Sequence, residues 1–200
     1  MIPLTYGNTN TFLLKTREGY LLVDTDLPGT LTAFYRAIGA ARVPVGEIRF
    51  VLATHYHPDH IGLIPSLTGQ GARLLMTDTQ KDAVRFSDGI FAKDAKLRSL
   101  WEPIRESGAV VLSCGESRAF FADLGLSGEI VSTPSHSPDS VSVLTDEGDC
   151  FVGDLERRGF IEGYGEGTPE REQLARDWET LLAHRPKRIF YAHGPGETLF

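Results

Sequence analysis

The sequence predicts a mixed α/β domain in which two β-sheets pack together and helices cover their outer faces. Apolar runs with strand spacing alternate with segments of helical spacing along the whole chain. No change in composition and no Pro/Gly-rich linker divides the 200 residues, of which 41% are hydrophobic and 24% charged. We therefore expect residues 1–200 to form a single domain.

The first part of the chain predicts a strand hairpin followed by alternating helices and strands. Residues 17–19 form a turn between two apolar runs, and apolar positions spaced three and four apart follow Pro28-Gly29 up to Gly39. A buried strand then leads directly into His55, and Pro58 suits the first position of the next helix. The strands are expected at 11–16, 20–24, 48–53 and 73–76.

Residues 79–107 are polar and helical in pattern, with large apolar residues scattered among them. They predict either a lid that lines a substrate pocket with Phe86, Phe91 and Trp101, or a helical insertion packed on the sandwich. The rest of the chain predicts further strands and one long helix at 169–183, which has a single apolar face. These strands are expected at 110–112, 118–121, 129–131, 140–144, 150–152 and 188–191.

A cluster of metal-ligand residue types follows the strand at 48–53. His55 and His57 stand two positions apart in an extended segment, so their rings point the same way. The chain then turns at Pro58, which lets Asp59 and His60 present side chains from the first helical turn. Imidazole and carboxylate groups at this spacing suit zinc or another first-row divalent metal.

Three later residues share one sequence context. His136, Asp154 and His193 each stand in a loop rich in Gly, Pro or Ser that directly follows an apolar strand. Loops at strand ends are where scaffolds usually carry binding and catalytic groups. We therefore expect these three side chains to join the first cluster.

The cluster, the later histidine, the Gly-Asp pair and the final histidine resemble the metallo-β-lactamase-fold hydrolases, most nearly their glyoxalase II-like and lactonase-like branches. The resemblance runs from Asn8 to His193 and implies an αβ/βα sandwich. It also implies two divalent metals, zinc first, with iron or manganese as alternatives. His55, His57 and His136 would bind one metal, Asp59, His60 and His193 the other, and Asp154 would bridge them.

In such a centre a hydroxide shared by the two metals attacks a carbonyl carbon. The expected substrate is a small thioester, ester or lactone, and Asp59 would both bind metal and orient the nucleophile. Two motifs depart from the glyoxalase II pattern: Pro134 to Asp139 replaces Pro-Gly-His-Thr-Pro-Gly, and Asp26 replaces the glycine of Asp-Thr-Gly. Arg157 stands where the quorum-signal lactonases place a tyrosine.

Other activities fit similar ligand sets. Persulfide dioxygenases use a single iron, and the diiron oxygen-reducing proteins usually add a flavin domain. Phosphodiesterases that process RNA carry extra RNA-binding parts, and this acidic chain has no Lys or Arg run. A non-catalytic metal-binding module is the last alternative.

Several residues have weaker claims to a role. Arg157, Arg158 or Tyr164 could contact a polar or anionic substrate group from the loop after Asp154, or could be solvated loop residues. Asp24 is expected to support a metal-binding histidine through its other ring nitrogen. His184, near a helix end, is given no ligand role.

The bulk properties bear on partners and location. The net charge of −7 argues against a general nucleic-acid binder, and no apolar run approaches the ~20 residues of a membrane span. Cys114 and Cys150 are expected to be reduced. The N-terminus lacks the pattern of a signal peptide, so we expect a cytoplasmic monomer or homodimer with no membrane partner.

Overall fold

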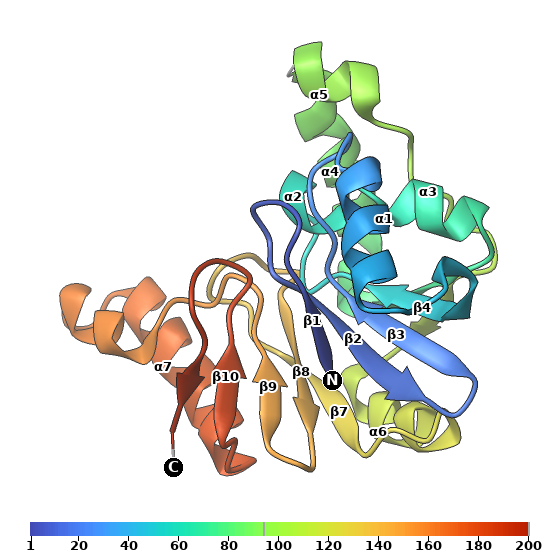
Figure 1. Cartoon of the computed structure of the whole chain (residues 1–200). Coiled ribbons are helices and arrows are strands. Elements are labelled where there is room, and N and C mark those ends of the chain that lie inside the picture. The colour runs from blue at the N-terminus through green and yellow to red at the C-terminus, as the bar shows by residue number, and fades with distance from the viewer. Residues whose placement is uncertain (94, 200) are drawn as a thin grey trace.

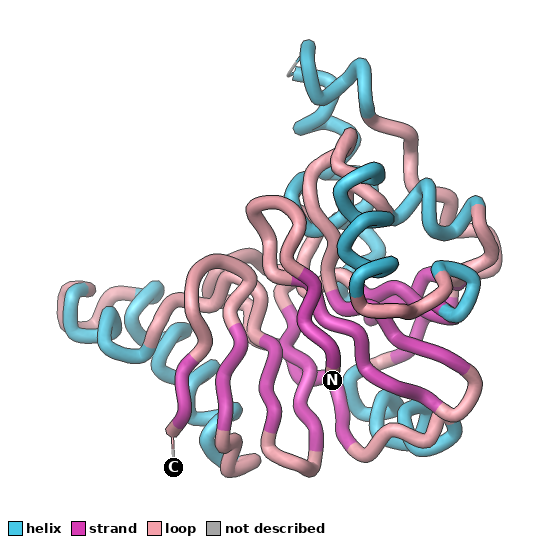
Figure 2. Tube along the Cα trace, viewed as in Figure 1, coloured by secondary structure: helices cyan, strands magenta, loops and turns pink. Residues whose placement is uncertain are grey.

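Two mixed β-sheets face each other in the computed structural model, which describes residues 1–93 and 95–199 (Figure 1). Helices lie on the outer faces of both sheets, as the trace coloured by secondary structure also shows (Figure 2). The predicted fold class, two mixed sheets flanked by helices, is confirmed. No helix among the described residues combines the length and the apolar character needed to cross a bilayer.

The first sheet has the strand order β1-β2-β3-β4-β5-β6. Its first three strands are antiparallel, with Phe12 opposite Val23, and β3 to β6 run parallel. The parallel part places the carboxyl ends of β3 and β4 side by side, which brings Asp24 next to Thr54. The strand bounds are β1 Ile2–Leu4, β2 Thr11–Thr16, β3 Gly19–Val23, β4 Ile48–Leu52, β5 Arg73–Thr77 and β6 Val110–Leu112.

The second sheet has the order β11-β10-β9-β8-β7. Within it β9 and β10 run parallel, and the other neighbours are antiparallel. Strands β7, β9 and β10 therefore all end at the same edge of the sheet. The bounds are β7 Gly128–Ser132, β8 Val141–Thr145, β9 Asp149–Phe151, β10 Arg188–Phe190 and β11 Glu197–Thr198.

Three apolar clusters hold the layers together. Side chains such as Phe12 and Phe151 fill the space between the sheets, with ring centroids 4.9 Å apart. A second cluster joins the first sheet to α1, α3 and α4, and a third packs Trp178 and its neighbours on α7 against the second sheet. The helices are α1 Leu31–Ala40, α2 Pro58–Ile61, α3 Ile64–Gly69, α4 Lys81–Lys93, α5 Ala95–Leu100, α6 Cys114–Asp123 and α7 Pro169–Ala183, with 3₁₀ segments η1 Val45–Glu47, η2 Asp78–Gln80 and η3 Arg158–Gly163.

The strand predicted at 118–121 is wrong, because these residues lie inside helix α6. Glu116 accepts hydrogen bonds from the backbone N–H and the hydroxyl of Ser113, a pairing typical of a helix start. Ser117 and Phe121, four positions apart, are the buried face of this helix. The adjacent pair Phe120-Phe121 gives this part of the sequence an apolar run like that of a strand. In the structure both side chains face apolar surroundings from the helix, because Phe120 packs on Phe50 of β4 and Phe121 is buried. The short edge strands β1 and β11 were not predicted.

The segment 79–107 is helical only as far as Leu100, so the helical pattern expected up to Ser107 is not met in its last residues. Phe91 is buried and its ring stacks on that of Trp101 with centroids 3.8 Å apart. Phe86, in contrast, is 67% exposed. In Figure 1 helices α4 and α5 stand above the first sheet, with α5 at the top of the view.

We expect Phe121→Ala to lower the free energy of unfolding by about 3–5 kcal/mol, because the truncation leaves a cavity between α6 and the sheets. Phe160→Ala, which changes a 57% exposed ring, should alter it by less than about 0.5 kcal/mol. Urea unfolding followed by circular dichroism measures both. Equal effects of the two substitutions would contradict the buried position of Phe121.

Candidate metal centre

The site lies at one edge of the sandwich, where loops from both sheets meet (above the upper ends of β8, β9 and β10 in Figure 1). Strand β4 leads to His55, and β7, β9 and β10 lead to the loops that carry His136, Asp154 and His193. Strands β7, β9 and β10 end on the same side because they run in the same direction within the second sheet, and the loop after β4 of the first sheet meets their loops here. Side chains up to about 140 positions apart in the sequence therefore come together here.

One group consists of His55, His57, His136 and Asp154, whose ligand atoms all lie within 4.8 Å of one another. His136 Nε2 is 3.1 Å from His57 Nδ1. Asp154 Oδ2 is 3.8 Å from His55 Nε2 and 3.7 Å from His136 Nε2. Three imidazoles and one carboxylate oxygen thus converge on one point.

The second group consists of Asp59, His60 and His193, again within 4.8 Å. His193 Nε2 is 3.2 Å from Asp59 Oδ2. Asp154 turns its other oxygen toward this group, with Oδ1 3.4 Å from His60 Nε2 and 3.3 Å from His193 Nε2. The two oxygens of Asp154 therefore face two different groups of ligands.

The residues present fit divalent metal ions. His55 Nε2, His60 Nε2 and Asp154 Oδ1 are buried, and within the described chain none has a hydrogen-bond partner. Buried polar atoms are normally paired, so three orphaned atoms facing one another indicate donors arranged for a ligand. Nitrogen and oxygen donors of this kind suit a first-row divalent metal.

Asp24 and Thr54 hold His60 from behind. The buried Asp24 accepts hydrogen bonds from the backbone N–H of Thr54 at 2.6 Å and from its hydroxyl at 2.9 Å. Its Oδ2 lies 3.2 Å from His60 Nδ1, so Nε2 of the ring is left to face the site. The structure thus places Asp24 against a ring nitrogen of His60, and its support of a metal-binding histidine stays a prediction.

Gly153 permits the loop after β9 to pack closely against Thr54. Its φ of 58° is in the left-handed region, and a Cβ atom there would lie 2.3 Å from Thr54 Oγ1. Any other residue would displace Thr54 or strain the backbone. Asp154, the next residue, owes its position to this contact.

The loop after β1 orients His193, a contact that was not predicted from the sequence. His193 Nδ1 is 3.0 Å from the carbonyl oxygen of Asn8, whose N–H donates to Asp26 Oδ2 at 2.9 Å. The buried Asp26 also accepts from the N–H of Leu27 at 2.7 Å. Asp26 is one of the two departures from the family motifs. A carboxylate where the family usually has glycine was the feature of the sequence that could have indicated this role.

Two more acids anchor ligand loops, and neither was predicted. Asp177 on α7 accepts a hydrogen bond from the N–H of Ser135, which fixes the loop of His136. Asp139 accepts from the N–H of Tyr56, between His55 and His57. The charged groups around the centre thus fix backbone as well as side chains. His184 lies at the end of α7, 3.3 Å from Glu129 and outside both ligand groups.

Burial and neighbouring charges set the protonation of the cluster. Burial lowers the pKa of His60, but Asp24 and Asp154 outweigh it and raise that pKa to about 10. Burial, with His60 and His136 close by, holds the pKa of His55 well below its usual range. Burial favours a higher pKa for Asp154, yet His60 and His193 lower it. Without metal, the cluster therefore holds a proton on His60 and keeps Asp154 ionised.

Two cavities flank the centre. The larger, about 490 Å³, is bounded by His57 and by residues of α4 and the 137–139 loop, including Phe86. The smaller, about 230 Å³, is bounded by His136, Asp154 and Tyr164. The hydroxyl of Tyr164 donates to Glu156 at 2.6 Å.

The other two residues considered for substrate contact line neither cavity. Arg157 donates to the carbonyl of Pro195 at 2.6 Å and lies over the ring of Tyr191, so it braces the loop of His193. Arg158 begins η3 and is exposed.

Comparisons with known proteins agree with the fold. The family model described as the metallo-beta-lactamase superfamily matches residues 4–193. The chain is 27% identical over 206 residues to the "Beta-lactamase-like protein 2 homolog" of Drosophila melanogaster, covering 96% of this chain and 60% of that protein. The Caenorhabditis elegans protein of the same name is 27% identical over 211 residues, and the match covers 96% of this chain and 58% of that protein. The chain therefore spans less than two thirds of these relatives.

Solved structures show the same fold. A metallo-beta-lactamase family protein of Thermus thermophilus, TTHA1429, superposes with a TM-score of 0.73 at 18% identity, over 98% of this chain and 73% of that one. The protein TTHA1623, crystallised in a di-iron-bound form, gives a TM-score of 0.71 at 26% identity, over 99% of this chain and 94% of that one.

In the metal-free protein we expect the His60 ring to stay protonated at pH 8 and to lose its proton near pH 10. The pKa of His60 in the folded state exceeds the ordinary value of about 6.5. Protonation of the ring therefore stabilises the fold, and this contribution has its full size below about pH 6.5. This contribution then falls as the pH rises to about 10. Nuclear magnetic resonance of ¹⁵N-labelled histidine follows the ring, and Asp24→Asn should lower the titration point. Titration near pH 6.5 in both proteins would contradict the role of Asp24.

Proposed function

The chain belongs to the metallo-β-lactamase superfamily, and on that basis we propose that it is a dinuclear metal-dependent hydrolase that acts on a carbonyl group. The superfamily fold and the His/Asp cluster are consistent with a metal-dependent hydrolase. The observation that carries the dinuclear proposal is the position of Asp154, whose two oxygens face two separate groups of ligand atoms.

We assign the residues as follows. His55, His57 and His136 would hold one metal, Asp59, His60 and His193 the other, and Asp154 would contribute one oxygen to each. Bound divalent metals at such a site lower the pKa of water toward neutrality and polarise a carbonyl oxygen. The substrate class is a thioester, ester or lactone, and no Ser or Cys nucleophile is needed.

The protein's own groups prepare this chemistry. Asp59 has its Oδ2 near His193 and its Oδ1 3.9 Å from His60 Nε2, on the partly exposed side of the centre. From there it would accept a hydrogen bond from the attacking water and so direct its lone pair toward the substrate. Asp24 keeps the proton on Nδ1 of His60 and so holds Nε2 in its ligand form.

Zinc is the first expectation for the metal, with iron and manganese as alternatives, because ligands of nitrogen and oxygen bind all three. The di-iron-bound form of TTHA1623 favours iron as the specific alternative. If iron is the resident metal, an oxidoreductase activity such as persulfide oxygenation becomes the second candidate. Phosphodiester hydrolysis ranks below both.

We further propose that residues 1–200 act as one catalytic domain on a small molecule. In this proposal α4, within the segment 79–107, forms a wall of the substrate pocket through Phe86, whereas Phe91 and Trp101 pack inside the segment. Tyr164 contacts the substrate from the smaller cavity, and Arg157 acts indirectly through the loop of His193. The cytoplasmic location, the absence of nucleic-acid partners and the monomer or homodimer stay predictions from the sequence.

We expect about two metal ions per chain in protein purified without added metal, as measured by inductively coupled plasma mass spectrometry. The same sample should hydrolyse at least one of a thioester, an ester and a lactone. About two zinc ions with carbonyl turnover would support the proposal. One iron, with oxygen consumed on adding a persulfide, would overturn it in favour of a dioxygenase.

We expect His193→Ala to bind about one metal ion fewer than the parent protein, because only the group of Asp59, His60 and His193 is disrupted. Its kcat/KM should fall at least about 100-fold, because the proposed reaction needs both metals. His184→Ala is the matched control, since His184 is the remaining histidine of the chain and lies outside both groups. Unchanged metal content in His193→Ala would contradict the assignment.

A further inference from the structure

We propose that the substrate is a neutral or cationic carbonyl compound whose apolar arm lies in the larger cavity against Phe86. This inference deepens the proposed function and depends on it. It rests on the position of the cavity, on the exposed ring of Phe86, and on the charges along the walls of both cavities.

The larger cavity begins at the metal centre itself. His57, a member of the first ligand group, forms part of its wall, so a substrate in the cavity has its reacting carbon within reach of that group. The volume of about 490 Å³ lies within the usual range for small-molecule pockets. Apolar groups of Ala83, Phe86 and Pro138 surround the space.

Phe86 is not part of the core. Helix α4 buries Val84 and Phe91 against the sandwich, whereas Phe86 is 67% exposed and borders the cavity. A large apolar ring that is exposed beside a cluster of ligand atoms supplies contact area for a bound molecule. An acyl or alkyl arm of the substrate would cover it.

The charges along both cavities have one sign. Their walls include Asp82, Asp139, Glu156 and Glu170, and no Lys or Arg among the described residues. Arg157, which could have contributed a positive charge, is engaged with Pro195 and Tyr191 outside both cavities. Apart from the histidines of the cluster, the charged side chains that a substrate arm with carboxylates or phosphates would meet in these walls are therefore all negative.

Bound metals do not reverse this conclusion. Their positive charge is partly neutralised by Asp59 and Asp154, and it acts on the reacting carbonyl of every substrate alike. Discrimination between substrates depends on the arms, which lie next to the four carboxylates. Neutral esters, lactones and thioesters of uncharged or cationic thiols are therefore favoured over phosphodiesters and over thioesters of acidic thiols.

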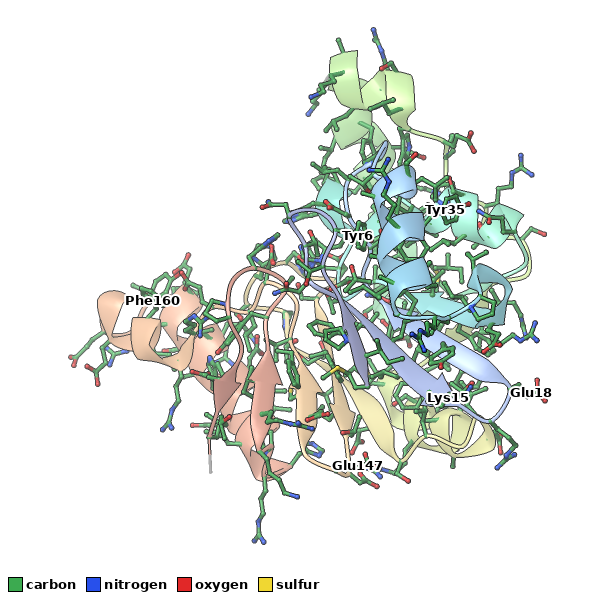
Figure 3. The ribbon with its side chains drawn as sticks, viewed as in Figure 1. Tyr6, Lys15, Glu18, Tyr35, Glu147 and Phe160 are labelled. Atoms are coloured by element: carbon green, nitrogen blue, oxygen red, sulfur yellow. The ribbon has the colours of Figure 1, made fainter. Side chains whose placement is uncertain are left out.

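The first test varies the apolar arm. With p-nitrophenyl esters and alkyl-substituted lactones of increasing chain length, kcat/KM should rise about 3- to 4-fold for each added methylene until the cavity is filled. Phe86→Ala should flatten this dependence, with about a tenfold loss for the longest chains and little loss for acetate. Phe160→Ala, which removes another exposed ring, on η3 and outside both cavities (labelled in Figure 3), should behave like the parent protein.

The second test varies the charge. Butyryl thioesters of thiocholine, N-acetylcysteamine and mercaptopropionate carry a cationic, a neutral and an anionic arm on one acyl group. We expect the anionic thioester to have a kcat/KM at least about tenfold below the other two, with a smaller difference at high salt. Asp82→Lys should reduce that ratio. Glu147→Lys, at the β8–β9 turn (labelled in Figure 3), should leave it unchanged.

The outcomes separate the two proposals. If the protein with two metals hydrolyses neither the esters, the lactones nor the thioesters, the proposed function fails, and this inference fails with it. If it hydrolyses them but prefers the anionic arm, or if Phe86→Ala keeps the full chain-length dependence, only this inference is overturned. Calorimetric binding of hexanamide, weaker in Phe86→Ala and unchanged in Phe160→Ala, would support it without relying on turnover.

Discussion

The buried contact between Asp24 and Thr54 is the constraint on which the site depends. It joins the ends of two parallel strands, and its carboxylate also fixes the ring of His60. Gly153 packs directly on Thr54, so the second sheet is placed against the same contact. The position of Asp154 between the two ligand groups follows from that packing. A change in this small region would move donors in both groups together.

The centre combines rigidly held side chains with buried polar atoms that lack hydrogen-bond partners among the described residues. Six side chains of the two groups surround Asp154, and His55 Nε2, His60 Nε2 and Asp154 Oδ1 are buried without a hydrogen-bond partner in the described chain. Buried polar atoms without partners are unfavourable, so the arrangement is less stable by itself than with cations between the groups. Metal binding and folding are therefore expected to be coupled, as they are in other proteins whose ligands converge only in the native state.

The surroundings of the centre divide its tasks. The strands supply the fixed positions, while acids outside the ligand groups hold the loops: Asp26 supports the loop next to His193, and Asp177 supports the loop of His136. Helix α4 then adds an apolar wall on one side, and Glu156 after β9 and Glu170 on α7 add acidic groups on the other. The His/Asp cluster and most of the cavity walls thus lie on different elements, so a change in the walls can leave the cluster intact.

The His/Asp cluster could be predicted from the sequence, because the spacing of His55, His57, Asp59 and His60 constrains their geometry locally, and each later member of the cluster follows an apolar strand. Most strands could be predicted as well, since their apolar runs are continuous, but Phe120-Phe121 could not, because local hydrophobicity does not separate a helix from a strand there. The folded structure was needed to show which oxygen of Asp154 faces which group, that Asp26 reaches His193 through Asn8, and that Phe86 rather than Phe91 borders the cavity. These relations depend on how two sheets and a helix pack across long sequence separations, and no local pattern of residues records that packing.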